Sequence, residues 1–261
     1  MRQLTLDRLY ELRLHGMRQA LKEQTDANSC QELSFDERLG LLIEAEDAWR
    51  MNSRIQVRIK KAKIRQNARI EELDYRTARN IDRGTLDSLA SCHWLKDKRN
   101  AILVGPAGVG KTFLASALTL RACQEGFSAR YFRAPRLLHD LDIARADGTY
   151  RNKLASLAHI DLIVLDDWLI APLQDAHRRD LLEILDDRYD NRSTMITSQM
   201  PVELWHQAIG DPTLADAILD RLVHNATHTD SISRETLCAK QRELGPMTVS
   251  STRTRELRKE D

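Results

Sequence analysis

The chain has 261 residues and a mass of 30.0 kDa; 42% of its residues are hydrophobic and 30% are charged. This size and composition exclude collagen-like, mucin-like and wholly disordered chains, and they allow one sizeable core with a smaller second domain. Because the formal net charge is +1 and the apolar runs are far shorter than the ~20 residues of a membrane span, we expect a cytoplasmic protein without a membrane partner, whose affinity for nucleic acid would depend on local clusters of basic residues.

Residues 1–70 predict a small all-helical N-terminal domain. They contain no proline and no strand signal. Ser34 and Glu37 stand at the spacing of a capping box, which marks the start of a long helix. Behind it apolar residues recur at helical spacing, and we expect this stripe to face a core: Leu39, Leu42, Ile43 and Trp49.

The second half of that helix concentrates basic residues. Between Trp49 and Glu71 there are eight lysines and arginines and no acid. Such a ladder can follow the phosphates of duplex DNA without reading bases. The alternative is a solvated face that pairs with acidic side chains elsewhere. The candidate DNA contacts, which fall on one helical face, are Arg54, Arg58, Lys61 and Arg65.

From about residue 100 the pattern changes to short β-rich runs separated by helical segments. The runs span residues 100–105, 129–133, 161–166 and 193–198. Strands at this spacing predict an α/β fold with a parallel sheet and crossover helices. We therefore place the core in residues 71–226, and we expect the polar tail, residues 227–261, to be disordered.

The loop after the first of these strands matches a phosphate-binding loop at every fixed position. Residues 105–112 read Gly-Pro-Ala-Gly-Val-Gly-Lys-Thr, between an apolar strand and a helix. In such a loop, backbone N–H groups bind phosphate, Lys111 neutralises the β- and γ-phosphate oxygens of ATP, and Thr112 offers its hydroxyl to Mg²⁺. A glycine turn without a ligand would not explain the Lys-Thr pair. The predicted nucleotide-binding residues are Gly105, Pro106, Ala107, Gly108, Val109, Gly110, Lys111, Thr112 and Phe113.

A second apolar run, residues 162–165, ends in two carboxylates, Asp166 and Asp167. This is the Walker B arrangement. Asp166 would hold Mg²⁺, and Asp167 would orient or deprotonate the attacking water. Taken alone, two aspartates after a strand could also mark a turn.

Further stretches resemble the AAA+ ATPases of the DnaC/DnaA clade, and within them the IstB-like helper ATPases encoded by bacterial insertion sequences. The resemblance covers residues 12 to about 226. Besides the two motifs above, it is carried by Leu-Arg-Leu-His-Gly-Met at 12–17, Arg-Leu-Gly-Leu-Leu at 38–42, Tyr-Phe-Arg-Ala-Pro-Arg at 131–136, Arg-Arg-Asp-Leu-Leu-Glu-Ile-Leu at 178–185 and the stretch from Gly-Asp-Pro to His-Asn-Ala at 210–226. It implies a bacterial helper that binds and hydrolyses ATP, forms homo-oligomers on duplex DNA, and recruits and stimulates a partner transposase during target capture.

The resemblance also implies roles for residues outside these motifs. Gln199, after the fourth strand, stands at the position of a sensor for the γ-phosphate, where many relatives have asparagine. Arg221 looks like an arginine finger, which reaches the nucleotide of a neighbouring subunit. Arg145 and Arg151 lie in a segment, residues 136–158, that looks like a helical insertion facing nucleic acid.

Two features depart from the resemblance. Leu169 stands where we expect glycine, so a backbone with positive φ there would be strained; the alternative is a loop conformation that tolerates leucine. After Ala226 the family continues to Gly-x-Ser-x-Arg, a second nucleotide sensor, which this chain lacks. A shifted reading of residues 229–240 permits that segment, so we hypothesise a frameshift near Ala226 that would impair turnover; the nucleotide sequence would test it.

Three other functions share parts of this pattern. A DnaC-like helicase loader has the same ATPase core and differs in an N-terminal segment that binds the helicase. A P-loop kinase of small molecules would transfer phosphate without DNA. A DNA-binding subunit without turnover would bind ATP but show no DNA-stimulated phosphate release.

Overall fold

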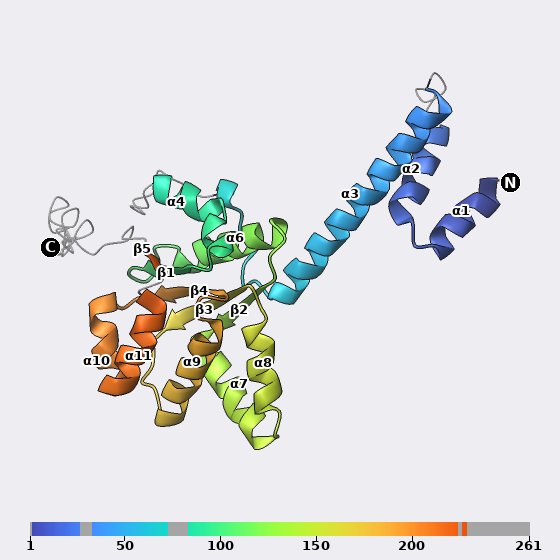
Figure 1. The fold of residues 1–261 in the computed structure, drawn as a ribbon. Helices are drawn as coiled ribbons and strands as arrows, with labels where there is room; N and C mark the ends of the chain where they lie inside the picture. Colours follow the sequence, from blue (N-terminus) through green and yellow to red (C-terminus); the bar gives the residue numbers. More distant parts are fainter. Residues whose placement is uncertain (1, 27–32, 73–82, 224–225, 229–261) are drawn as a thin grey trace, which may run out of the picture.

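The computed structural model describes residues 2–26, 33–72, 83–223 and 226–228. In these ranges the chain forms a helical arm and an α/β body (Figure 1). No helix in the described ranges is both long and apolar enough to span a membrane. The arm consists of α1 (Arg2–Glu11), α2 (His15–Asp26) and α3 (Phe35–Ala62), of which α3 runs from the far end of the arm to the body.

The body is built around a five-stranded sheet in which all neighbouring strands are parallel. The four predicted strands are confirmed. β5 adds Thr227 and His228 to the sheet, two residues beyond the predicted end of the core. In spatial order the strands are β2 (Ala129–Arg133), β3 (Leu162–Trp168), β4 (Ser193–Ser198), β1 (Asn100–Val104) and β5 (Ala226–His228).

Helices cover both faces of the sheet (Figure 1). Successive residues of a strand point to opposite faces, so each face has its own apolar core. Leu103 and Val164 pack toward one core, whereas Ile102, Ile163 and Leu165 pack toward the other. The first face carries η2 (Ile70–Glu72), α4 (Arg83–Ala90), α5 (His93–Lys96) and α6 (Lys111–Gln124); the second carries α7 (Ala134–Ala146), α8 (Tyr150–Ala158), α9 (Asp175–Arg188), η3 (Val202–Leu204), α10 (Trp205–Ile209) and α11 (Pro212–Val223).

The carboxyl ends of β1, β3 and β4 lie side by side. Val104 pairs with Ser198, and Leu165 pairs with Ile196. The loop after β1, the end of β3 and the residue after β4 therefore meet at one edge of the sheet, which is where parallel α/β sheets bind their ligands.

The arm depends on a close approach of α2 to α3. A Cβ atom at Gly16 would lie 2.4 Å from the carbonyl oxygen of Ala45, so only glycine fits here without displacing α3. The buried Glu46 of α3 accepts hydrogen bonds from the backbone N–H groups of Gly16 at 2.8 Å and Met17 at 3.2 Å. These bonds satisfy N–H groups that the first turn of α2 leaves free. The close approach accounts for the glycine in the stretch Leu-Arg-Leu-His-Gly-Met at 12–17.

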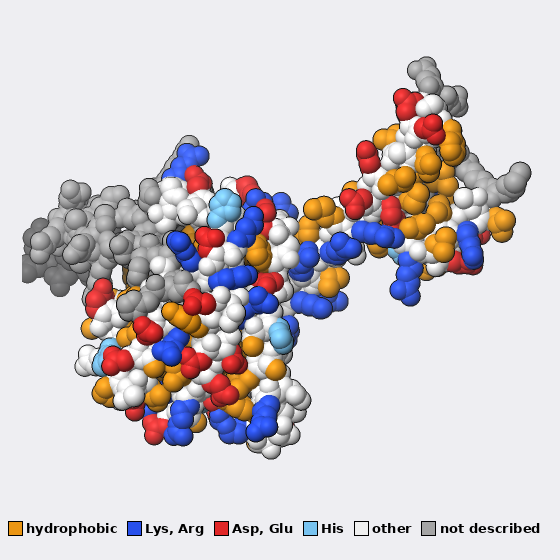
Figure 2. Space-filling model, in the orientation of Figure 1, with side chains coloured by type: hydrophobic (Ala, Val, Ile, Leu, Met, Phe, Trp, Pro, Cys, Tyr) orange, Lys and Arg blue, Asp and Glu red, His pale blue; other side chains and the backbone are white. Residues whose placement is uncertain are grey.

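The apolar stripe of α3 is largely exposed. The predicted capping box forms, with the N–H of Ser34 donating to Glu37 at 2.8 Å. The expectation that the stripe faces a core is wrong for Leu39, Ile43 and Trp49, which are all exposed. α2 packs along one side of α3, and the described arm has no further helix to cover the other; Figure 2 shows hydrophobic side chains gathered on the arm.

Candidate nucleotide-binding site

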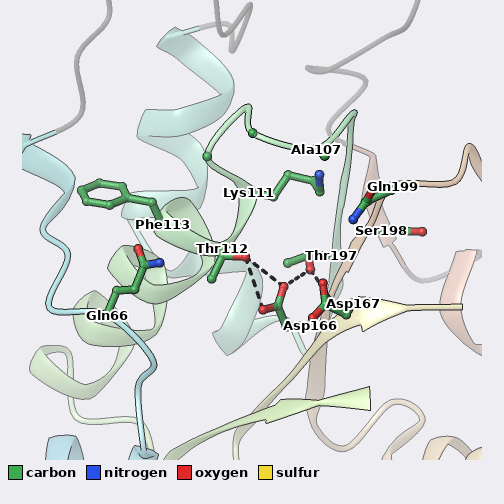
Figure 3. A pocket seen from close by; sticks show the side chains of 12 residues that line it. Gln66, Ala107, Lys111, Thr112, Phe113, Asp166, Asp167, Thr197, Ser198 and Gln199 are labelled. Atoms are coloured by element: carbon green, nitrogen blue, oxygen red, sulfur yellow. Dashed lines mark hydrogen bonds between the residues drawn. The ribbon is translucent and has the colours of Figure 1, made fainter. Parts of the chain in front are cut away.

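The loop after β1 borders an open cavity of about 260 Å³ at the carboxyl edge of the sheet (Figure 3). Gly108 has φ 83° and Gly110 has φ 91°, a left-handed backbone that glycine adopts without strain. α6 begins at the next residue, so its unpaired N–H groups are available at the loop. The lining residues come from this loop, β3, β4 and the segment after α3: Gln66, Ala107, Gly108, Gly110, Lys111, Thr112, Phe113, Asp166, Asp167, Thr197, Ser198 and Gln199.

The side chain of Lys111 is folded into the loop. Its Nζ donates hydrogen bonds to the carbonyl oxygens of Gly105 at 2.6 Å and Pro106 at 2.7 Å. Burial lowers the pKa of Lys111, while the charges of Asp166 and Asp167 act in the opposite direction. The ammonium group thus lies at the loop that the sequence assigns to the phosphates.

Asp166 is the most enclosed acid of the site, with a side chain that is 1% exposed. The Thr112 Oγ1 atom lies 3.3 Å from each of its carboxylate oxygens, and the Thr197 hydroxyl donates to its Oδ1. The same Thr197 oxygen accepts a hydrogen bond from the N–H of Asp167 at 3.3 Å. The motifs did not point to Thr197, because a threonine inside a strand carries no distinguishing signal.

These oxygen atoms fit a divalent cation. The hydroxyl of Thr112 and the carboxylate of Asp166 face each other in Figure 3 and belong to the ligand class that Mg²⁺ takes beside phosphate oxygens and water. Thr197 holds the carboxylate in place. The two predicted metal ligands are therefore brought together.

Two arginines bind the carboxylates. Arg65 Nη1 lies 3.2 Å from Asp166 Oδ2 and 4.0 Å from Asp167 Oδ2. Arg133, at the end of β2, places its Nε 2.9 Å from Asp167 Oδ2. The prediction that Arg65 extends the basic ladder of α3 is wrong, because the helix ends three residues earlier with a left-handed residue at its C-cap.

The two residues assigned by resemblance lie in different places. Gln199 follows β4 and lines the cavity. Arg221, on α11, does not line it; its guanidinium pairs with Asp186 and, at 3.4 Å, with Asp220. Arg221 is therefore engaged outside the nucleotide cavity of its own chain, an arrangement that is compatible with action on a neighbouring subunit.

The backbone after the Walker B strand is unusual. The pairing of β3 with β4 shifts register between Leu165 and Trp168, and within this bulge Asp167 has φ 60°. Leu169 follows with φ 55°, so the position takes the conformation that favours glycine. Its side chain is 8% exposed and belongs to the core beneath α9 and α10. The chain thus combines a strained backbone with a buried leucine.

The candidate DNA contacts on α3 remain on the surface. Arg54 and Lys61 are exposed, and Arg58 is half-buried. Figure 2 shows basic side chains along the arm on the side where it meets the body. Three of the four predicted members of the ladder are therefore placed on one helix.

The two candidate DNA contacts in the α7–α8 hairpin, Arg145 and Arg151, have different surroundings. Arg151 is exposed. Arg145 hydrogen-bonds Asp180, pairs with Asp142 at 3.5 Å and lies over the ring of Tyr150 at 4.6 Å. Arg145 is also exposed, but these contacts engage its guanidinium, so Arg151 is the better placed of the two for a phosphate.

A family model described as IstB-like ATP binding protein matches residues 7–244. The chain belongs to the IstB-like ATP-binding family. Membership supports ATP binding and, at a general level, an ATPase. The match extends past Ala226 to residue 244, whereas the residues that the structure describes end at His228. The frameshift hypothesis therefore stays a prediction.

Relatives in the family are named for insertion sequences. The chain is 47% identical over 238 residues to the insertion-sequence ATP-binding protein y4pL of Sinorhizobium fredii, covering 91% of this chain and 97% of that protein. It is 48% identical over 202 residues to the ATP-binding protein of insertion sequence IS1162 from Pseudomonas fluorescens, covering 77% and 87%.

Two solved structures share the fold of the body. DnaI matches with a TM-score of 0.54 at 21% identity, over 61% of this chain and 88% of that chain. AMPPCP-bound DnaA from Aquifex aeolicus matches with a TM-score of 0.50 at 16% identity, over 59% and 49%. The predicted AAA+ P-loop fold is confirmed, and at this identity the likeness extends to the fold alone.

Proposed function

We propose that this protein is the ATP-dependent helper of an insertion-sequence transposase. It hydrolyses ATP, assembles into homo-oligomers on duplex DNA in the bacterial cytoplasm, and promotes target capture by the partner transposase. The observation that carries the proposal is the meeting of Lys111, Thr112 and Asp166 at one cavity, in a chain whose relatives are named for insertion sequences.

Nucleotide binding follows from the loop and its lysine. N–H groups at the start of α6 and in residues 105–110 would bind phosphate oxygens, and Lys111 would exchange its two carbonyl acceptors for the β- and γ-phosphates. Thr112 and Asp166 would hold Mg²⁺. When bound, the metal neutralises charge that develops on the transferred phosphoryl group.

Hydrolysis would need residues from two subunits. Asp167 orients or deprotonates the attacking water, and Gln199 hydrogen-bonds the γ-phosphate or that water. Arg221 of a neighbouring copy stabilises the transferring charge, a contribution that in phosphoryl-transfer enzymes is worth about 10³-fold to about 10⁵-fold in kcat. Turnover would then depend on assembly.

Duplex DNA would be held through its phosphates. Arg54, Arg58 and Lys61 repeat along one side of α3, and Arg151 supplies a second point on the α7–α8 hairpin. Such contacts position the DNA without reading its sequence. Binding would therefore weaken steeply with salt and depend little on base sequence.

Sedimentation on a duplex of ~60 base pairs, a length that spans several helical turns of DNA, tests the whole proposal. Wild type should form large complexes with ATP, and Lys111→Ala and Arg221→Ala should not. Arg54→Ala combined with Arg58→Ala should lower the slope of log affinity against log salt by about 2. Arg8→Ala is the matched control, because Arg8 is an exposed arm residue that pairs with Glu11 at 2.7 Å.

A mixing experiment separates action in trans from action in cis. Asp167→Asn and Arg221→Ala each lack one half of the composite site. If Arg221 acts on a neighbour, a mixture regains part of the turnover, because an interface that joins the intact Asp167 of one variant to the intact Arg221 of the other is complete. A mixture as inactive as its components would refute the finger assignment. DNA-independent phosphate transfer to a small molecule would refute the helper function.

A further inference from the structure

Arg65 joins the segment after α3 to the Walker B carboxylates. Its guanidinium lies 3.2 Å from Asp166 and 4.0 Å from Asp167, although 101 residues separate Arg65 from Asp166 in the chain. The Asp166 side chain is 1% exposed and that of Arg65 is 44% exposed. A buried carboxylate needs a compensating partner, whereas this arginine can withdraw into water at little cost.

The backbone just before Arg65 is anchored to the body. Ala62, the last residue of α3, is fully buried in the core that α6 and β2 share. Arg130 of β2 donates a hydrogen bond from its Nη1 atom to the carbonyl oxygen of Lys61 at 3.0 Å. Lys63 then ends the helix with φ 51°. Gln66, one residue after Arg65, lines the nucleotide cavity. The position of Arg65 at the carboxylate is therefore set by the root of the arm.

A divalent cation and this guanidinium would compete for one carboxylate. Mg²⁺ held by Thr112 and Asp166 would repel the guanidinium of Arg65, and this repulsion is weakly screened beside a carboxylate that is 1% exposed. We infer that Arg65 is a tethered cation that neutralises Asp166 in the empty site and withdraws when nucleotide binds with Mg²⁺. This inference rests on the proposed binding of ATP with Mg²⁺.

Replacement of Arg65 by Mg²⁺ at Asp166 sets the Mg²⁺ concentration that nucleotide binding requires. Binding of Mg²⁺ includes the free energy of breaking the Arg65–Asp166 pair, so by linkage the loss of Arg65 must raise the affinity for Mg²⁺. Withdrawal of Arg65 also breaks a contact between the segment that follows α3 and the edge of the sheet. Arg133 does not take part, because its partner is Asp167.

The test is a Mg²⁺ titration of nucleotide binding by the full-length protein. A fluorescent, non-hydrolysable ATP analogue reports binding, so turnover does not enter the measurement. Arg65→Ala is compared with Arg65→Lys, which keeps a competing charge, and with Arg69→Ala, an exposed arginine of the same segment. Circular dichroism establishes that each variant is folded.

We expect Arg65→Ala to lower the half-saturating Mg²⁺ concentration by about fivefold or more, the usual lower range of coupling between bound groups. The half-saturating Mg²⁺ concentration of Arg65→Lys should remain closer to that of wild type, and Arg69→Ala should have the wild-type value. An unchanged or higher Mg²⁺ requirement in folded Arg65→Ala would overturn the inference while leaving the proposed function standing. Failure of wild type to bind the analogue at any Mg²⁺ concentration would overturn both.

Discussion

Leu169 offers a sharp test of the backbone beside the Walker B acids, because two opposing effects meet at one residue. Its φ of 55° is unfavourable for any residue with a Cβ atom. Its burial, at 8% exposure, favours a large apolar side chain. Replacement by alanine removes the buried side chain and keeps the strain. Replacement by glycine removes both.

The magnitudes predict that the glycine variant is more stable than the alanine variant, the reverse of the usual order. Truncation of a buried leucine to alanine costs about 2–5 kcal/mol in either context. A left-handed backbone costs a residue with a Cβ about 1–2 kcal/mol, and only glycine escapes that cost. Glycine also loses about 0.5–1 kcal/mol through the flexibility of the unfolded chain. Leu169→Gly should therefore be more stable than Leu169→Ala by about 1 kcal/mol, or about 2–4 °C in Tm for a domain of this size.

Leu185 supplies the matched control. It is buried in the interior of α9 at 3% exposure, where glycine is worse than alanine by about 1 kcal/mol. Thermal unfolding of the four variants should show alanine above glycine at position 185 and glycine above alanine at position 169. The same order at both positions would refute the reasoning and mean that the backbone at Leu169 carries no strain.

The other predictions concern the arm and the cations of the site. Gly16→Ala should destabilise the protein by about 1–3 kcal/mol through overpacking, whereas Gly40→Ala, which has nothing within 4 Å, should stabilise it by about 1 kcal/mol; urea unfolding that gave equal shifts would contradict the close approach of α2 to α3. Because the pKa of Lys111 is lowered in the empty protein, nucleotide affinity should begin to fall with rising pH before the ordinary lysine value of 10.5, and an affinity flat up to that value would contradict this. Arg133→Ala should free Asp167 and raise phosphate release severalfold with little change in nucleotide affinity; unchanged turnover would show that the pair does not restrain Asp167.

The sequence predicted what local signals determine. A parallel strand covered on both faces reads as a short apolar run, and the residue after it lies at the ligand-binding edge of the sheet. This is why the four strands, the loop at residues 105–112 and Asp166 could be placed from the sequence pattern, whereas Gln199 was placed by the resemblance. Leu169 was also singled out, because the resemblance has glycine there and a positive φ would strain a leucine; the structure shows φ 55°.

Contacts between distant segments could not be predicted. Arg65 had the spacing of a helical ladder, but the helix ends at Ala62 and the side chain turns to an acid more than a hundred positions away. Arg188 has the local pattern of a surface residue at the end of α9. The structure buries it, and its guanidinium donates to the carbonyl oxygens of Leu157 and Ile160, each at 2.7 Å. Long polar side chains find such partners through tertiary packing, which helical periodicity does not encode.

The charges around the cavity give a physical reason for assembly to depend on nucleotide. The side chains around the site carry one net positive charge, because three cations face two carboxylates: Lys111, Arg65, Arg133, Asp166 and Asp167. An incoming Arg221 from a second copy would be repelled. ATP bound with Mg²⁺ adds about two negative charges, and withdrawal of Arg65 removes a positive one, so the loaded site is negative. The same arginine is then attracted, and attraction of this kind speeds association as well as strengthening it. Under the proposed function, ATP therefore favours assembly before any phosphate is transferred.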